Sequence, residues 1–170
     1  MHRSVRFALV LAAALACVIG LVPGAVAATP RQRLANVVVP AYCTMPRQRL
    51  HDGNTAAKYQ PAMGWMTLSG PAAPIRVHLR HRTQLLAEYD CTAGGVSWPS
   101  VLVLYSRTNR LIAFLKLERY SNTEHSNVVR WKVLSGHRVL VRWASYNGCC
   151  FDLHHHRSIL VLRHGKLRFA

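Results

Sequence analysis

Four cysteines that follow residue 27 carry the most specific chemistry of the chain: Cys43, Cys91, Cys149 and Cys150. In an oxidising compartment an even number of cysteines is typical of disulfides, and four cysteines allow three pairings. Adjacent cysteines rarely bridge each other, because the small ring strains the peptide between them. We therefore expect Cys43 and Cys91 each to pair with one member of the Cys149–Cys150 doublet.

The alternative for these thiols is a metal site, since His154, His155 and His156 follow the doublet. In an extended segment His154 and His156 share one face and His155 points to the other, so at most two of them can chelate together. Outside the cytoplasm a disulfide is the more common fate of such thiols. We expect disulfides, with no metal and no cofactor.

The local motifs of hydrolytic enzymes are missing from the sequence. The stretch Gly95-Val96-Ser97-Trp98-Pro99 has proline where a nucleophile elbow needs its second glycine. Glu88 and Asp90 share one face of an expected strand, where we expect them to be exposed and solvated. We assign no catalytic residue and expect a non-catalytic protein. A secreted hydrolase built from distant residues is one alternative, and a protein inhibitor that presents the loop Thr92 to Pro99 is another.

The charge of the chain restricts its partners. Its 22 Lys and Arg residues against 6 Asp and Glu give a formal charge of +16. Such a field favours anionic partners, namely wall or capsule polymers, acidic proteins, lipid headgroups or nucleic acid, without choosing among them. Arginine far outnumbers lysine, so a compositional bias explains the same excess equally well.

A predicted hairpin between Val128 and Trp143 is the candidate anion-binding surface. If Ser135-Gly136-His137 is a three-residue loop, apolar residues of both strands face inward together. These are Val129, Trp131, Val133, Val139, Val141 and Trp143. The same register places four cations on the outer face: Arg130, Lys132, Arg138 and Arg142.

Arg130 then lies directly opposite Arg142, a destabilising arrangement that a bound anion would relieve. The alternative is that these side chains splay into water, where screening makes the repulsion small. Because Trp131 and Trp143 face inward in this register, the outer face lacks the aromatic residues that stack on bases. We therefore favour an anionic envelope polymer or an acidic protein over nucleic acid.

The N-terminus has the features of a signal peptide. His2, Arg3 and Arg6 precede an apolar run from Phe7 to Val22, and Ala25-Val26-Ala27 forms a small-residue cleavage site. We expect residues 1–27 to be removed and residues 28–170 to form one domain in the cell envelope or outside the cell, with no membrane span. An uncleaved anchor, or lipidation at Cys17, is the alternative.

The sequence predicts that the elements carrying these residues are mainly β-strands. Thr29 and Pro30 predict a short helix that ends before Pro40, and residues 52–74 have the composition of a loop. Alternating or continuous apolar segments follow; their ranges are Arg76–Arg80, Leu85–Cys91, Val101–Tyr105, Leu111–Leu117, Val128–Trp143 and Ser158–Phe169. We expect an all-β fold, an antiparallel meander or sandwich of about six to eight strands with a short N-terminal helix.

Several of these segments resemble a family. They are Val39-Pro40-Ala41-Tyr42-Cys43, the stretch from Cys91 to Pro99 with the pattern Cys-x-x-Gly-Gly-Val-x-Trp-Pro, and the late Cys149-Cys150 pair. Together they are similar to uncharacterised secreted or lipid-anchored actinobacterial proteins. Some members carry a calcium-binding type of loop before the strand that leads to the second cysteine. The corresponding residues 78–83 contain no carboxylate here, so the resemblance implies an exported disulfide-bonded domain and no metal site.

Overall fold

The computed structural model describes residues 27–55, 65–68, 72–79, 82–93, 96–148 and 151–170 of the chain. The predicted signal peptide, the Cys149–Cys150 doublet and the tip of the loop between Thr92 and Pro99 lie outside these ranges. The elements run α1 (Pro30–Leu34), β1 (Val38–Val39), β2 (Gln48–Arg49), β3 (Trp65–Thr67), β4 (Ile75–His78), β5 (Thr83–Ala93), β6 (Val96–Ser106), β7 (Leu111–Lys116), η2 (Leu117–Tyr120), β8 (His125–Leu134), β9 (Arg138–Asn147), β10 (Phe151–Arg163) and β11 (Lys166–Phe169).

The predicted all-β class is confirmed, and the strand pairs are antiparallel. The described residues form eleven strands, more than expected, because β1, β2 and β3 contain only two or three residues each. β3 lies within residues 52–74, which were predicted to be a loop. One sheet has the order β11-β10-β9-β8, and a second has the order β3-β5-β6-β7 with β4 also paired to β5.

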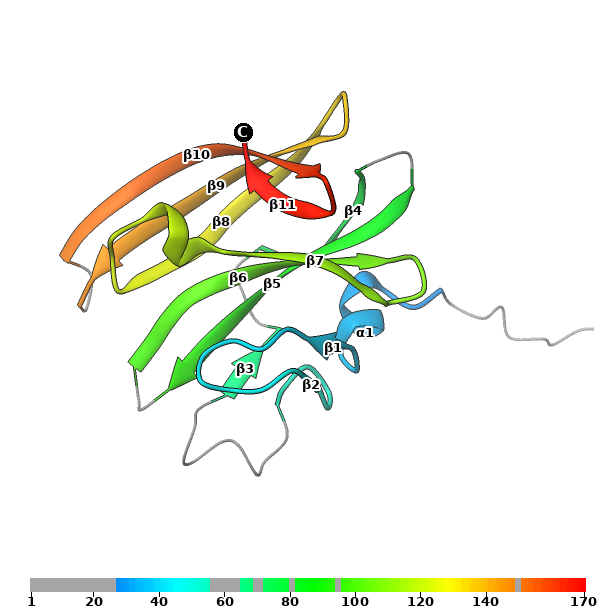
Figure 1. Ribbon diagram of the computed structural model, residues 1–170, viewed down its shortest axis with the longest axis horizontal. Coiled ribbons are helices and arrows are strands. Elements are labelled where there is room, and N and C mark those ends of the chain that lie inside the picture. Colours follow the sequence, from blue (N-terminus) through cyan, green and yellow to red (C-terminus); the bar gives the residue numbers. More distant parts are fainter. Residues whose placement is uncertain (1–26, 56–64, 69–71, 80–81, 94–95, 149–150) are drawn as a thin grey trace, which may run out of the picture.

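The second sheet is the middle layer of the domain, and its central strands β5 and β6 are buried on both faces. Figure 1 shows it between the β8–β11 sheet and the N-terminal segment that contains α1, β1 and β2. Alternate residues of β5 and β6 enter two different cores. Leu85, Ala87, Val101 and Val103 pack with the N-terminal segment, whereas Leu86, Leu102 and Leu104 pack with the β8–β11 sheet. All five residues of the apolar segment Val101–Tyr105 are buried, whereas its partner segment Leu111–Leu117 exposes Ile112 and Phe114.

The helix begins where the sequence predicts. The Thr29 hydroxyl accepts the N–H of Gln32 at 3.2 Å, and the Gln32 side chain accepts the N–H of Thr29 at 2.8 Å. This reciprocal cap satisfies two N–H groups that a helix leaves unpaired, and Pro30 supplies a preformed first turn. Leu34 is fully buried and anchors the helix against the middle sheet.

Cys43 and Cys91 form a disulfide with each other, with a Cα–Cα distance of 6.2 Å. The predicted pairing of each with the Cys149–Cys150 doublet is therefore wrong. Cys91 belongs to the face of β5 that packs on the N-terminal segment, and Cys43 lies in the same core cluster. The bridge staples the N-terminal layer to the middle sheet and closes a sequence separation of 48 residues, worth about 4 kcal/mol in the chain-entropy treatment.

The β8–β9 hairpin has the predicted three-residue loop. Leu134 pairs with Arg138, Val133 with Val139 and Trp131 with Val141. A β-bulge then intervenes between Val128 and Arg130, so that Val128 and not Val129 lies opposite Trp143. Val139, Val141 and Trp143 are buried as predicted, but Val129 is 51% exposed because the bulge turns it outward.

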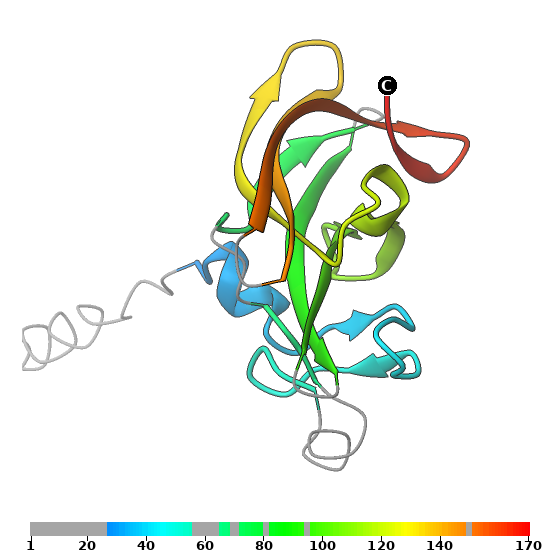
Figure 2. The same ribbon diagram turned by 90° about the vertical axis from the view of Figure 1, so that its left-hand side faces the viewer.

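Val133 and Trp131 were also predicted to face inward, and the structure buries them only in part. Val133 is 46% exposed although its partner Val139 is buried, and Trp131 is half-buried. The predicted segment Ser158–Phe169 forms the last hairpin, in which Leu160 lies opposite Phe169 and Leu162 opposite Leu167. β10 curves along its length and brings β11 beside β7, as Figure 2 shows.

Candidate functional site

The predicted cations lie where β8 and β9 present their outer face. Arg130 is directly opposite Arg142, and both side chains are exposed. Lys132 lies opposite Leu140, and these residues line an open hollow of about 390 Å³ together with Trp131. Arg138 is not part of this group. It lies at the hairpin loop and lines a separate hollow with His137 and Arg163.

A third arginine, which the sequence analysis did not assign, extends the pair. β10 runs antiparallel to β9 and places Arg157 directly opposite Arg142 on the other side. Arg130, Arg142 and Arg157 thus form a straight row across three neighbouring strands, called here the arginine row. Side chains alternate between the two faces of a strand, so the sequence after His154 places Arg157 on the face opposite to His156. Placing Arg157 beside Arg142 also requires knowing that β10 pairs with β9.

The local sequence holds the hairpin that carries Arg130 and Arg142. Gly136 has a φ of +68°, a left-handed conformation that side chains resist, and His137 follows at +59°. The ring of His137 contacts the carbonyl oxygen of His78 at 2.6 Å through Nδ1, which ties the loop to the end of β4. The indole N–H of Trp131 donates to the Ala73 carbonyl at 2.9 Å. These contacts fasten the hairpin to the middle sheet.

The electrostatics of the arginine row are unbalanced. Like charges directly opposite on neighbouring strands repel, and the exposed side chains of the row limit this repulsion by diverging into water or by sharing an anion. Within the described residues the ion pairs join Lys116 with Glu118 and His125 with Glu124, and neither involves the row. An anion laid across the three guanidinium groups would offset this repulsion, since each guanidinium offers five N–H donors.

The opposite face of the same sheet carries a contact that resembles part of a hydrolase site. Ser145 Oγ lies 2.7 Å from His156 Nε2, and the His156 ring stacks on Trp143 at 3.8 Å between centroids. Burial, with smaller contributions from His154 and His155, lowers the pKa of His156. However, Ser145 is only 1% exposed, so its hydroxyl cannot reach a substrate. The contact joins β9 to β10.

Glu88 was predicted to be solvated and is in fact buried. Its side chain is 1% exposed between the two sheets, on the same face of β5 as Leu86. Burial raises the pKa of Glu88 to about 8, although the N–H of Val128, which donates to Oε1, favours the ionised form. Asp90 is partly buried and accepts a hydrogen bond from the Ser100 hydroxyl at 2.7 Å. Because strand β5 is covered on both faces, neither face could expose both carboxylates.

The segment from Thr92 to Pro99, predicted to be a loop, is largely a hairpin. Thr92 pairs with Ser97 and Ala93 with Val96. Tyr42 donates its hydroxyl to the Pro99 carbonyl at 2.5 Å, and its ring meets Trp98 edge-on. The described part of this segment is therefore held in the sheet by backbone pairing.

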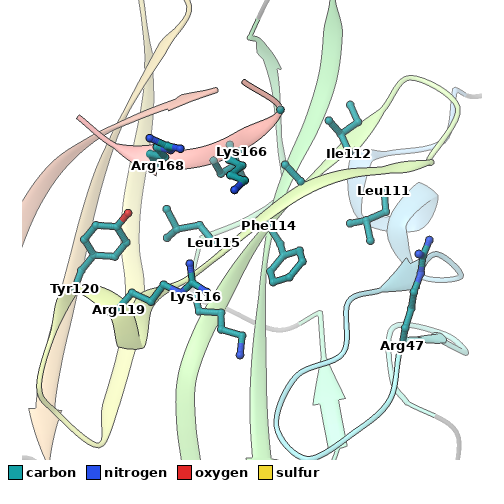
Figure 3. A pocket seen from close by; sticks show the side chains of 13 residues that line it. Arg47, Leu111, Ile112, Phe114, Leu115, Lys116, Arg119, Tyr120, Lys166 and Arg168 are labelled. Atoms are coloured by element: carbon teal, nitrogen blue, oxygen red, sulfur yellow. The ribbon is translucent and has the colours of Figure 1, made fainter. Parts of the chain in front are cut away.

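A second group of cations surrounds the free edge of the middle sheet. A groove of about 640 Å³ runs along β7, between β11 on one side and the segment before β2 on the other. Figure 3 shows the groove with its labelled cations, which are Arg47, Lys116, Arg119, Lys166 and Arg168. Sequence patterning did not bring these residues together, because they come from four separate segments.

Comparison with known proteins adds no assignment: no family model, curated protein or solved structure matches this chain. In the described residues no helix is long and apolar enough to cross a membrane.

Proposed function

We propose that the domain is a non-catalytic module of the cell envelope that binds an anionic polymer across the outer face of β8, β9 and β10. The observation that carries the proposal is the position of Arg142, which has an arginine directly opposite it on each neighbouring strand. Such a row is unfavourable unless anions occupy it. Wall or capsule polymers that carry carboxylates or phosphates are the partners that fit.

The spacing of the row supports a repeating ligand. The backbones that carry the three arginines are held in register on paired strands about 4.8 Å apart, so the origins of the three side chains are fixed before an anion binds. A guanidinium binds carboxylate or phosphate oxygens through two parallel N–H donors. A polymer with regularly placed anionic groups can therefore engage two or three of these sites at once, and the linked contacts reinforce one another.

The Cys43–Cys91 disulfide is consistent with a location outside the cytoplasm, where such polymers occur. The alternatives have less support. The hydroxyl in the Ser145–His156 contact is buried, which disfavours a hydrolase at that position. The Thr92–Pro99 hairpin is bonded into the middle sheet, which disfavours an inhibitor that uses it as an exposed loop.

Binding to defined polyanions tests the proposal. Polygalacturonate offers carboxylates, polyphosphate offers phosphates, and dextran is a neutral control. We expect Arg130→Gln/Arg142→Gln to weaken binding to at least one polyanion by about tenfold and to make its salt dependence shallower, because fewer counterions are released. Arg31→Gln/Arg76→Gln removes the same charge from exposed positions away from the row.

Equal losses in the two double variants would show that only net charge matters and would refute the proposed face. Preferential binding to single-stranded nucleic acid over both polyanions would replace the polymer by a different partner. Circular dichroism of both variants checks that each keeps its β-sheet.

A further inference from the structure

Strand β7 is an open edge of the middle sheet. Among the described strands its one hydrogen-bonded neighbour is β6, on the side away from the groove. An edge strand presents unpaired backbone N–H and C=O groups, which form a template for another extended chain. In Figure 3 β7 crosses the groove between Lys166 and Arg168 of β11 and, on the other side, Arg47.

The groove combines positive charge with exposed apolar surface. None of the residues that line it is acidic, and the carboxylate of Glu118 lies 3.4 Å from the Lys116 ammonium group. Ile112, Phe114 and Tyr120 in the groove are 37%, 41% and 41% exposed. These are three of the six large hydrophobic residues that are exposed in the described chain, so the apolar surface is concentrated here. Such concentration marks an interaction site.

We infer that β7 binds an extended acidic peptide segment of a partner protein, which pairs with its free edge as an added strand. Main-chain hydrogen bonds to β7 would provide affinity for any extended chain. Side chains of the added strand alternate between the two walls of the groove, and both walls carry cations. Acidic residues at these positions would pair with Arg47 on one wall and with Lys166 or Arg168 on the other.

The positive charge of the groove also excludes a second copy of this chain as its occupant. A second copy of this chain would bring two cationic grooves together, and the chain carries a formal charge of +16. The site is distinct from the arginine row, because it lies at the edge of the other sheet and uses backbone groups. The inference therefore stands or falls independently of the polymer proposal.

Fluorescence anisotropy with a labelled peptide of alternating Glu and Thr provides the test. The peptide needs at least the six residues of β7. The control is the same sequence N-methylated at every residue, which keeps the charge but has no N–H to donate. We expect the control to bind about tenfold more weakly, and we expect the backbone amides of β7 to gain protection from hydrogen exchange only with the unmodified peptide.

Charge variants locate the site. Lys166→Gln/Arg168→Gln should weaken peptide binding several-fold, whereas Arg130→Gln/Arg142→Gln should leave it unchanged while reducing polymer binding. Equal binding of both peptides, or binding without protection of the β7 amides, would overturn the strand-addition inference. Failure of the peptide to bind, combined with Lys166-dependent sedimentation on phosphatidylglycerol vesicles, would assign the groove to a lipid surface and would also overturn it.

Discussion

The backbone N–H of Val128 donates to the carboxylate of Glu88, across the interface between the two sheets. Val128 lies at the bulge of β8, so this bond satisfies a donor where the regular ladder to β9 is interrupted. In the described structure the second oxygen of Glu88 has no hydrogen-bond partner. The carboxyl group therefore serves as an acceptor at the bulge, a role that its protonated form also fills.

Replacing Glu88 by glutamine should change how stability depends on pH. The pKa of Glu88 is about 8 in the folded protein and near 4.5 when the side chain is free in solution. The folded state thus holds a proton that the unfolded chain releases, and its contribution to stability is full below pH 4.5 and is lost as pH rises towards 8. Each pH unit in that window costs up to about 1.4 kcal/mol.

We expect Glu88→Gln to remove this slope, because the amide oxygen still accepts the Val128 N–H and the side chain cannot ionise. Urea unfolding at several pH values from 5 to 9 measures the difference from the parent protein. Asp52→Asn, at an exposed carboxylate, is the control and should keep the parent slope. An unchanged slope in Glu88→Gln would contradict the buried, protonated carboxyl group.

The disulfide assignment predicts a specific peptide map. Proteolysis of the unreduced protein should yield a peptide containing Cys43 linked to one containing Cys91. Cys43→Ala/Cys91→Ala should lower the free energy of unfolding by about 4 kcal/mol, mainly by loosening the unfolded chain. A linkage from either cysteine to the Cys149–Cys150 doublet would reject the assignment.

Arg157 tests whether the arginine row acts as a unit. Its substitution by glutamine should weaken polyanion binding about as much as Arg130→Gln does, because each flanks Arg142 from one side. Arg163→Gln is a matched control on the same strand, near the last hairpin. Titration with the polyanion that binds most tightly compares the three variants. Normal binding by Arg157→Gln would confine the site to β8 and β9.

Gly136 should be sensitive to any side chain. Its φ of +68° lies in the left-handed region, and an added Cβ would stand 3.6 Å from Arg138 Nε, so the cost comes from the backbone and not from a clash. Gly136→Ala should destabilise the domain by about 1 kcal/mol. Thermal unfolding measures this, with Ser135→Ala in the same loop as the control. A similar loss in both variants would indicate a general sensitivity of the loop.

A fluorophosphonate probe distinguishes a structural Ser145 from a nucleophilic one. Such probes label serine hydroxyls that are both activated and accessible. Because Ser145 is 1% exposed, we expect no label on it in the folded protein. Labelling of Ser145 that disappears in His156→Gln would establish a working serine–histidine pair and revive the hydrolase alternative.

Local pattern was sufficient to predict much of the β8–β9 and β10–β11 hairpins. The turn residues and the alternation of apolar side chains fix the register from the loop outward, and hence the opposition of Arg130 and Arg142. The pattern failed at Val128 and Val129. The bulge there involves Glu88, which is 40 residues away in sequence and was itself predicted to be solvated.

The other misjudged features share this cause. Pairing Cys91 with Cys43 requires knowledge of which layer covers each face of β5, and placing Arg157 beside Arg142 requires the pairing of β9 with β10. The groove along β7 depends on the curvature of β10, which brings Lys166 and Arg168 to the edge of the other sheet. These are long-range relationships, and the spacing of residues along the chain does not encode them directly.

The position of the middle sheet between two cores also determines how the domain unfolds. Leu85 and Leu86 are neighbours in one strand, yet each belongs to a different core, and the same holds for Leu102 and Val103. Neither the N-terminal layer nor the β8–β11 sheet can detach without uncovering one face of β5 and β6. The domain should therefore melt as one cooperative unit, and a fragment that ends before His125 should aggregate through the bared leucines.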